Sequence, residues 1–375
     1  MSITHVEVLS SDSECDATDG DAPPLKIVKT RHSHLAAASM GISGKEFRRM
    51  KRWRAPNLFF QVLLLLHQIT GWLPMRHDGA EWFSGVSAVQ ESLVEDSLLA
   101  FAYDWTRGNH MDFTSPLGFA FAASRSKELK PGSTSHWDTV CSSFVWMAQK
   151  HCRRTITDIL GDERCWATKS GNLMVVRMVL LSLYHLSKFA VFLLEQPSSS
   201  VMRNHPHFEY LEYAAKDLKL LTNEPVPDPS LEGITDVPTW MGSFGGPTPK
   251  RSVLSCSHPD VVLPLHRTLS KADKARLAGE SVVTDEYVME SGRLKHKVTG
   301  KRRKLKQTQI YPRGYGKAVS LSYRQWLRGF EKRHNLHDDS SDSDYCADLP
   351  DWPEAELTSV IKLLLRKRPN CRRAF

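Results

Sequence analysis

The chain has 375 residues, 41% of them hydrophobic, which is enough to bury a sizeable core in one large domain or two ordinary ones. Its net charge of +8 and pI near 9.1 favour polyanions over acidic solutes as partners. Seven cysteines fall at irregular spacing without a C-x-x-C pair. This pattern argues against both a zinc site and a disulfide framework, and it fits a reducing compartment.

No secretory signal opens the sequence, because the first residues are polar and acidic. The longest apolar stretch, residues 58–74, is interrupted by Gln61, His67 and Gln68. A membrane span needs about 20 apolar residues, so this stretch predicts a buried helix instead. We therefore expect a soluble intracellular protein, nuclear or cytoplasmic, with no membrane partner.

The first 78 residues divide into two segments of different composition. Residues 1–40 contain the run SSDSECDATDGDAPP, which is too polar to build a core and predicts a disordered tail. Residues 41–78 indicate a helical segment that is cationic in its first half and apolar in its second. Pro56 stands between the two halves and marks a break or kink.

Short apolar runs alternate with longer helix-like stretches over residues 79–262. The clearest unit is residues 171–189, where apolar residues recur at helical spacing and the run AVFLL follows directly. A helix that leads into a buried strand is typical of βαβ units. We therefore predict an α/β fold with a Rossmann-like, doubly wound sheet in this region.

The chain beyond this core turns polar and is predicted to form three segments. Residues 263–332 form a basic extension, residues 333–352 an acidic disordered linker, and residues 353–375 a basic amphipathic helix. The cationic run KRRKLK at 301–306 has two compatible interpretations, a solvated basic face or nuclear-import peptide, or a site for phosphate contact. In the second, Tyr311 and Tyr315 stack on exposed bases. The residues we expect to contact nucleic acid are Lys301, Arg302, Arg303, Lys304, Lys306 and Arg313.

Chemically useful side chains follow the predicted strands in order. Ligands of an open α/β sheet collect beyond the carboxyl ends of its strands. Gly85 follows the first strand, and Asp104 follows the second at the offset where a carboxylate can accept ribose hydroxyl protons. Asp112 is taken to follow a third strand, Cys141 a fourth and Glu195 a fifth. If the last two strands are neighbours, the thiol and the carboxyl face one pocket.

The ordered blocks FSG, AYDW, MDF, TVCSSF, LLEQP and MGSFGGPTPKRSVL resemble those of DNA cytosine-C5 methyltransferases over about residues 79–260. More closely, the chain looks like an expanded group of uncharacterised dinoflagellate proteins that share CSS-x-x-W, EQP and FGG-x-T-x-K. The first resemblance implies a methyltransferase-type sheet and S-adenosyl-L-methionine as cofactor. The second implies no particular activity.

The enzyme resemblance also implies a role for each residue of the site. Cys141 would attack C6 of a cytosine and Glu195 would hold its N3 edge, while Arg251 would lie near the target base. Phe83 and Gly85 would line the amino-acid part of the cofactor. Asp104 would bind the ribose, and Trp105 or Asp112 would contact the adenine.

Three hypotheses for the function remain open. The chain is either a methyltransferase acting on cytosine, with DNA favoured over RNA, or an inactive methyltransferase-derived module, spread by a mobile element, that binds nucleic acid or a partner protein. The third hypothesis is a structural protein with no ligand. Val140 and Gln196 stand where the enzyme family has Pro and Asn. The histidines show no metal-ligand spacing, so we expect no metal. The sequence carries no signal for an oligomeric state.

Overall fold

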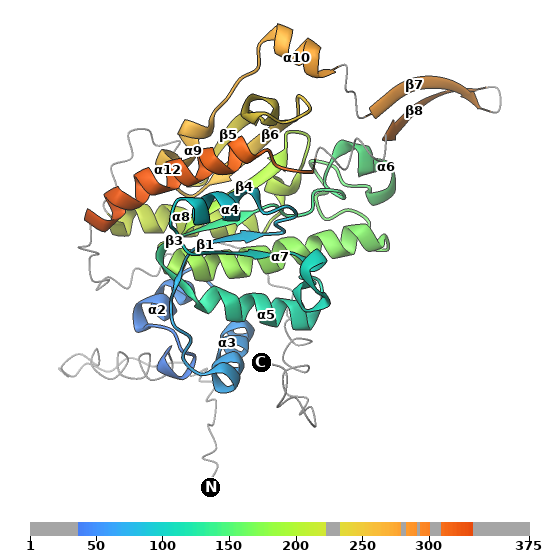
Figure 1. Cartoon of the computed structure of the whole chain (residues 1–375). Helices are drawn as coiled ribbons and strands as arrows, with labels where there is room; N and C mark the ends of the chain where they lie inside the picture. The colour runs from blue at the N-terminus through green and yellow to red at the C-terminus, as the bar shows by residue number, and fades with distance from the viewer. Residues whose placement is uncertain (1–36, 223–232, 279–282, 291–292, 301–308, 333–375) are drawn as a thin grey trace, which may run out of the picture.

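The computed structural model describes residues 37–222, 233–278, 283–290, 293–300 and 309–332. Its centre is a six-stranded sheet with helices on both faces (Figure 1). The strands of this sheet are β1 (His77–Trp82), β2 (Ala100–Tyr103), β3 (Leu129–Trp137), β4 (Val191–Pro197), β5 (Thr235–Trp240) and β6 (Arg251–Cys256). A separate two-stranded hairpin consists of β7 (Val283–Glu290) and β8 (Arg293–Gly300).

The strand order is β2-β1-β3-β4-β6-β5, and only β6 runs antiparallel to its neighbours. From β1 the chain goes to one side to form β2 and then returns to the other side to form β3. This change of direction makes the carboxyl ends of β1 and β3 the switch point where open α/β sheets bind ligands. The predicted α/β class is therefore confirmed, and the mostly parallel six-stranded sheet is compatible with a Rossmann-like fold.

Helices cover both faces of the sheet. On one face α4 (Ala88–Glu95) packs against α12 (Arg313–Lys332), and α12 also contacts the short α9 (Pro259–Val262). The opposite layer contains α7 (Trp166–Ser187) with α2, α5 and α8 against it (Figure 1). The remaining helices are α2 (Gly44–Arg52), α3 (Asn57–Thr70), α5 (Pro116–Lys127), α6 (Gln149–Cys152), α8 (Phe208–Thr222) and α10 (Lys271–Ala278), with the 3-10 helices η1 (Trp105–Arg107), η2 (Asn109–Met111), η3 (Trp146–Ala148), η4 (Met202–Asn204), η6 (Met241–Phe244) and η7 (Leu263–Leu265).

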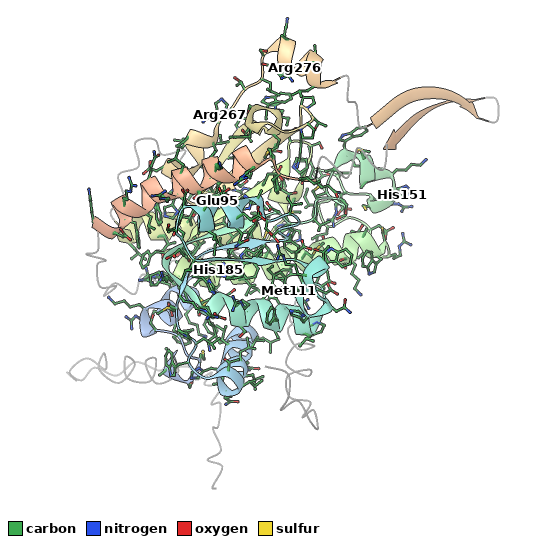
Figure 2. The ribbon with its side chains drawn as sticks, viewed as in Figure 1. Glu95, Met111, His151, His185, Arg267 and Arg276 are labelled. Carbon is green, nitrogen blue, oxygen red and sulfur yellow. The ribbon has the colours of Figure 1, made fainter. Side chains whose placement is uncertain are left out.

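Helix α7 and strand β4 form the apolar centre, as the pattern at 171–189 predicts. Six of the seven β4 residues are buried, because the strand lies between two helical layers. One polar side chain, His185, is built into this centre (Figure 2). The His185 ring stacks on Trp82 and Trp137, and its two nitrogens lie 2.9 and 2.7 Å from the hydroxyls of Ser135 and Ser126. Burial lowers the pKa of His185 well below its usual value, so the ring is neutral.

The N-terminal segment forms two helices, α2 and α3, on either side of Pro56. Helix α2 begins with a capping box, in which the Ser43 side chain accepts from the Glu46 N–H and the Glu46 carboxylate accepts from the Ser43 N–H. Within the described residues, no helix is long and apolar enough to cross a membrane.

One predicted strand is absent. We placed a strand before Asp112, but the chain between β2 and α5 forms η1 and η2 instead. Gly108 separates these two turns with a φ of 156°, and the segment WTRGNHM lacks the apolar alternation of a strand. Asp112 therefore lies in a loop rather than at a strand end.

Helix α12 belongs to the folded core, although the sequence assigned it to the basic extension. Its Gly316 lies so close to α4 that an added Cβ would be 2.0 Å from the carbonyl oxygen of Ala88. The Tyr323 hydroxyl is 3.0 Å from the Asp78 carbonyl and 2.9 Å from the Gly132 carbonyl, so it bridges two strands. A boundary at residue 262 therefore cuts through the core.

We predict that Gly316→Ala lowers the free energy of unfolding by about 1–3 kcal/mol, because the backbone of α4 cannot yield to the new methyl group. Chemical denaturation measures the change. Leu321→Ala is the control on the same helix, since Leu321 is 57% exposed, and we expect it to change stability by about 0.5 kcal/mol or less. An increase in stability for Gly316→Ala would contradict this packing of α12 on α4.

Candidate functional site

The turn after β1 has three residues with left-handed backbone conformations. The φ angles of Phe83, Gly85 and Ser87 are 61°, 49° and 62°. Such angles are costly for residues other than glycine and concentrate at functional sites. A Cβ added to Gly85 would meet no atom within 4 Å, so its backbone borders open space. The turn can therefore bring backbone groups close to a ligand.

Asp104 follows β2 and holds this turn in place. Its Oδ2 accepts from the Gly85 N–H at 3.0 Å, and its Oδ1 accepts from the Thr106 N–H at 2.8 Å and the Thr106 hydroxyl at 2.6 Å. A carboxylate offers about four acceptor sites, and the protein uses three of them. Asp104 can thus accept one ribose hydroxyl, and a second requires the Thr106 hydroxyl to turn away.

Two further residues predicted for the cofactor differ in availability. The Trp105 side chain is 67% exposed beside the turn, where its ring face can contact a purine. The Oδ1 of Asp112 accepts from the Thr114 N–H at 2.9 Å and from the Thr114 hydroxyl at 2.7 Å. Asp112 therefore shapes its own loop through this pair of hydrogen bonds.

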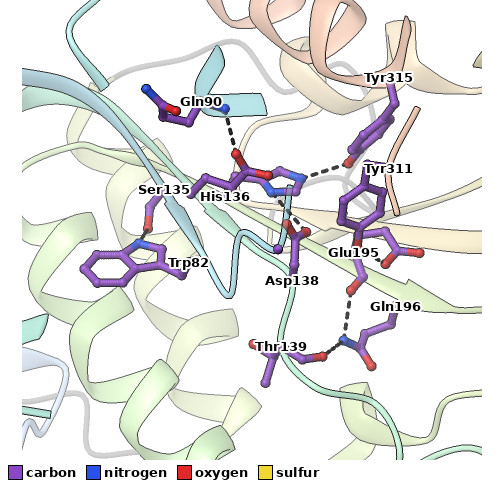
Figure 3. A network of polar contacts seen from close by, with 12 residues as sticks. Trp82, Gln90, Ser135, His136, Asp138, Thr139, Glu195, Gln196, Tyr311 and Tyr315 are labelled. Atoms are coloured by element: carbon purple, nitrogen blue, oxygen red, sulfur yellow. Dashed lines mark hydrogen bonds and ion pairs between the residues drawn. The ribbon is translucent and has the colours of Figure 1, made fainter. Parts of the chain in front are cut away.

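Cys141 and Glu195 lie at the carboxyl ends of two adjacent parallel strands. Trp137 pairs with Leu194 across β3 and β4, so the strand ends are level and Cys141 follows in the next loop. The Gln196 amide donates to the Thr139 carbonyl at 2.8 Å and fixes this loop against β4 (Figure 3).

The Cys141 thiol responds to two charged neighbours. Burial raises its pKa above the usual value, the Lys250 ammonium opposes this increase, and the Glu195 carboxylate adds to it. The sequence predicted the thiol and the carboxyl at one edge, and the structure brings them into one electrostatic environment together with Lys250. The raised pKa means that the thiol is protonated at neutral pH.

The Glu195 carboxylate is only 3% exposed and is bound by two groups. The Tyr311 hydroxyl donates to Oε2 (Figure 3). The Lys250 ammonium lies 3.1 Å from Oε1. Tyr311 follows Glu195 by 116 positions in the chain. The segment before α12 thus forms a hydrogen bond with the carboxylate that we expected to hold a cytosine.

The basic residue beside Glu195 is Lys250, whereas we expected Arg251 near the target base. Arg251 is exposed, and its guanidinium lies 5.9 Å from the centre of the Trp240 ring. Consecutive side chains of an extended chain point to opposite sides, so Arg251 and Lys250 cannot both face Glu195. The alternation along PKRSVL is the sequence signal that separates the two residues.

The basic C-terminal region gives a mixed outcome. We expected Tyr311 and Tyr315 to stack on exposed bases, but both rings are buried in the core, so that prediction is wrong. Arg313 has an exposed side chain that forms an ion pair with Glu95. The rest of the predicted nucleic-acid contact, Lys301, Arg302, Arg303, Lys304 and Lys306, lies outside the described residues.

A second polar group, which sequence reasoning missed, lies at the ends of β1 and β3. Glu81 and His136 are fully buried, and Asp138 has a side chain that is 4% exposed. Burial raises the pKa of Glu81 to about 8, and the nearby Asp138 adds to this increase. Burial lowers the pKa of His136, but Asp138 outweighs it and the pKa is raised overall. Burial also raises the pKa of Asp138, against the opposing effects of His136 and Tyr311.

Comparisons with protein-family models, with curated proteins and with solved structures found no match for this chain.

We predict that iodoacetamide at pH 8 modifies Cys165 well before Cys141, because the thiolate is the reactive form. Cys165 precedes the first residue of α7, and the Thr168 N–H lowers its pKa, whereas burial raises the pKa of Cys141. Peptide mass spectrometry over time measures both rates. Lys250→Met should slow Cys141 further and leave Cys165 unchanged. Equal rates for the two cysteines in the unmodified chain would contradict the raised pKa of Cys141.

Proposed function

We propose that this protein is an S-adenosylmethionine-dependent methyltransferase that acts at C5 of cytosine in DNA, with Cys141 as its nucleophile. The observation that carries the proposal is the common electrostatic environment of Cys141, Glu195 and Lys250 at the ends of adjacent parallel strands. Neighbouring parallel strand ends are where α/β enzymes assemble their chemistry.

The proposed reaction uses each of these groups in a separate role. The Cys141 thiolate adds to C6 of the cytosine while Glu195 holds the N3 edge, and C5 takes the methyl group. A base then removes the C5 proton, and the C6–S bond breaks to restore the ring and free the thiolate. A cytosine in a duplex must first leave the base stack. Since the thiol is protonated at rest, its proton must be transferred as substrate binds, and the Lys250 ammonium favours the resulting thiolate.

The turn after β1 fits the proposed cofactor, which supplies an activated methyl group. The open space beside Gly85 lets backbone approach a ligand, and Asp104 retains an acceptor site for a ribose hydroxyl. The exposed Trp105 ring supports adenine contact. Phe83 packs edge-on against Phe113 and borders the same turn.

The sheet topology supports the proposal at the level of the fold. A switch point between β1 and β3 is the usual ligand site of a doubly wound sheet. The single reversed strand, β6, separates this sheet from the all-parallel dinucleotide-binding sheet. The methyltransferase type that the sequence favours accommodates such a strand. The basic run at 301–306 supports a nucleic-acid partner and a nuclear location.

The second candidate is a catalytically inactive module derived from such an enzyme, and one contact favours it. The Tyr311 hydroxyl donates a hydrogen bond to the Glu195 carboxylate, so this carboxylate is not free to bind a base unless the segment before α12 moves. Val140 and Gln196, at positions where the resembled enzymes have Pro and Asn, point the same way. The two candidates differ in cofactor binding and methyl transfer.

Calorimetric titration with S-adenosylmethionine distinguishes the candidates. We expect saturable binding that Asp104→Asn weakens about 10- to 100-fold, because a hydrogen bond to a charged acceptor is worth about 1.5–3 kcal/mol. Asp236→Asn, which changes an exposed acid on the edge strand β5, is the control and should bind normally. No heat at millimolar cofactor would favour the inactive module.

We predict that Cys141→Ala abolishes transfer of labelled methyl groups to cytosine-containing DNA and that Glu195→Gln nearly abolishes it. The first variant removes the nucleophile, and the second removes the charge that binds the base edge. Cys256→Ala is the control, because Cys256 is buried in β6, pairs with Leu193 rather than with Glu195, and has no role in the proposed reaction. An active Cys141→Ala protein would remove the nucleophile assignment.

A further inference from the structure

The buried group formed by Glu81, His136 and Asp138 has no role in the proposed methyl transfer. Each of the three residues offers one nitrogen or oxygen atom, and these atoms all lie within 4.8 Å of one another. Glu81 comes from β1 and His136 from β3, with Asp138 directly after β3. The group therefore lies at the switch point of the sheet and would tie two neighbouring strands together.

One polar atom of this group lacks a hydrogen-bond partner among the described residues. It is Oε1 of Glu81, on a fully buried side chain. The Asp138 Oδ1 lies 3.1 Å from the His136 Nδ1, and the Tyr311 hydroxyl beside Asp138 donates its one proton to Glu195. Burying a carboxylate oxygen without a partner costs several kcal/mol, and a cation held between the two carboxylates and the imidazole would remove that cost.

The neighbours of this group orient its unpaired atoms inward. The His136 Nε2 lies 2.9 Å from the Tyr315 hydroxyl, so with its proton on Nε2 the ring keeps a free lone pair on Nδ1. The Glu81 Oε2 accepts from the Gln90 N–H at 2.7 Å, whereas Oε1 has no hydrogen-bond partner among the described residues. Metal-binding histidines and carboxylates are held in this way by hydrogen bonds on their outer side.

We propose that Glu81, His136 and Asp138 bind one divalent transition-metal ion, of the Zn²⁺ class, with protein ligands Oε1, Nδ1 and a carboxylate oxygen. The His136 Nδ1 is 3.1 Å from the Asp138 Oδ1. Two ligands at about 2.0–2.1 Å from one ion, at tetrahedral or octahedral angles, lie about 2.9–3.4 Å apart. Two carboxylates neutralise the 2+ charge, and the imidazole selects a transition metal over Ca²⁺ or Mg²⁺. Three protein ligands leave at least one coordination position of the ion to be filled by another group.

The test uses the full chain, freed of metal by dialysis against a chelator and then titrated with Co²⁺ and Zn²⁺. We expect one ion per chain, a higher melting temperature with either ion, and Co²⁺ ligand-field bands without sulfur-to-metal charge transfer. Failure of the chain to retain or bind either ion would overturn the proposal. A sulfur charge-transfer band would also overturn it, because the bound ion would then belong to cysteines.

Variants assign the ion to this group. Asp138→Asn should reduce Co²⁺ affinity at least about 100-fold, and Tyr315→Phe, which removes only the support of His136, should reduce it about 10-fold. Asp273→Asn, an acid in α10 away from the sheet, is the control and should bind as the unchanged chain does. Circular dichroism identifies folded variants, and Tyr315→Phe preserves the ring if Asp138→Asn does not fold. Undiminished Co²⁺ binding in a folded Asp138→Asn or Tyr315→Phe chain would refute the assignment.

Discussion

The carboxyl edge of the central sheet buries ionisable side chains, and the fold depends on how they are satisfied. Two tyrosines before and at the start of α12 supply hydroxyls to this edge, Tyr311 to Glu195 and Tyr315 to His136. A buried charge without a hydrogen bond would cost several kcal/mol, which is a large part of a domain's stability. The segment before α12 is therefore a required part of the sheet edge, although it follows the last strand of the sheet in the chain.

This dependence explains why the core extends beyond β6. Helix α12 covers α4, and its Tyr323 hydroxyl satisfies carbonyls from the sheet. Its first turn carries Tyr315, fully buried between the sheet and Phe244. A chain that ended at residue 262 would leave an apolar face of α4 and the polar edge of the sheet open to water. The basic composition of α12 reflects its solvent-facing side, and its buried side is aromatic.

Much of the fold follows from local patterns in the sequence. The run that begins β4 is apolar, and most of the helical spacing at 171–189 falls in α7, which ends at Ser187. The strand expected before Asp112 does not form, because nearby Gly108 and a polar segment favour turns. Local pattern also placed Cys141 and Glu195 at neighbouring strand ends, because parallel strands of a βαβ unit end at the same edge.

Local sequence patterns could not predict the long-range contacts. Nothing near Tyr311 in the sequence identifies Glu195 as its partner, 116 positions away, and its aromatic, basic surroundings suggested a nucleic-acid surface instead. The group of Glu81, His136 and Asp138 has the same difficulty, since its ligand atoms meet only when β1 and β3 pair. His136 and Asp138 are two positions apart in the sequence, and this short spacing is the one local sign of that group.

The stretch of chain that carries Tyr311 and Tyr315 connects Glu195 with the group of Glu81, His136 and Asp138. A cytosine offers amino N–H donors, so in replacing the Tyr311 hydroxyl it would keep the Glu195 carboxylate satisfied. The exchange would still require the Tyr311 ring to leave a buried position, and α12 begins only two residues later. Tyr315 lies on the first turn of that helix and contacts His136. A base bound at Glu195 would therefore affect the contact between Tyr315 and His136, because only a short stretch of chain separates Tyr311 from Tyr315.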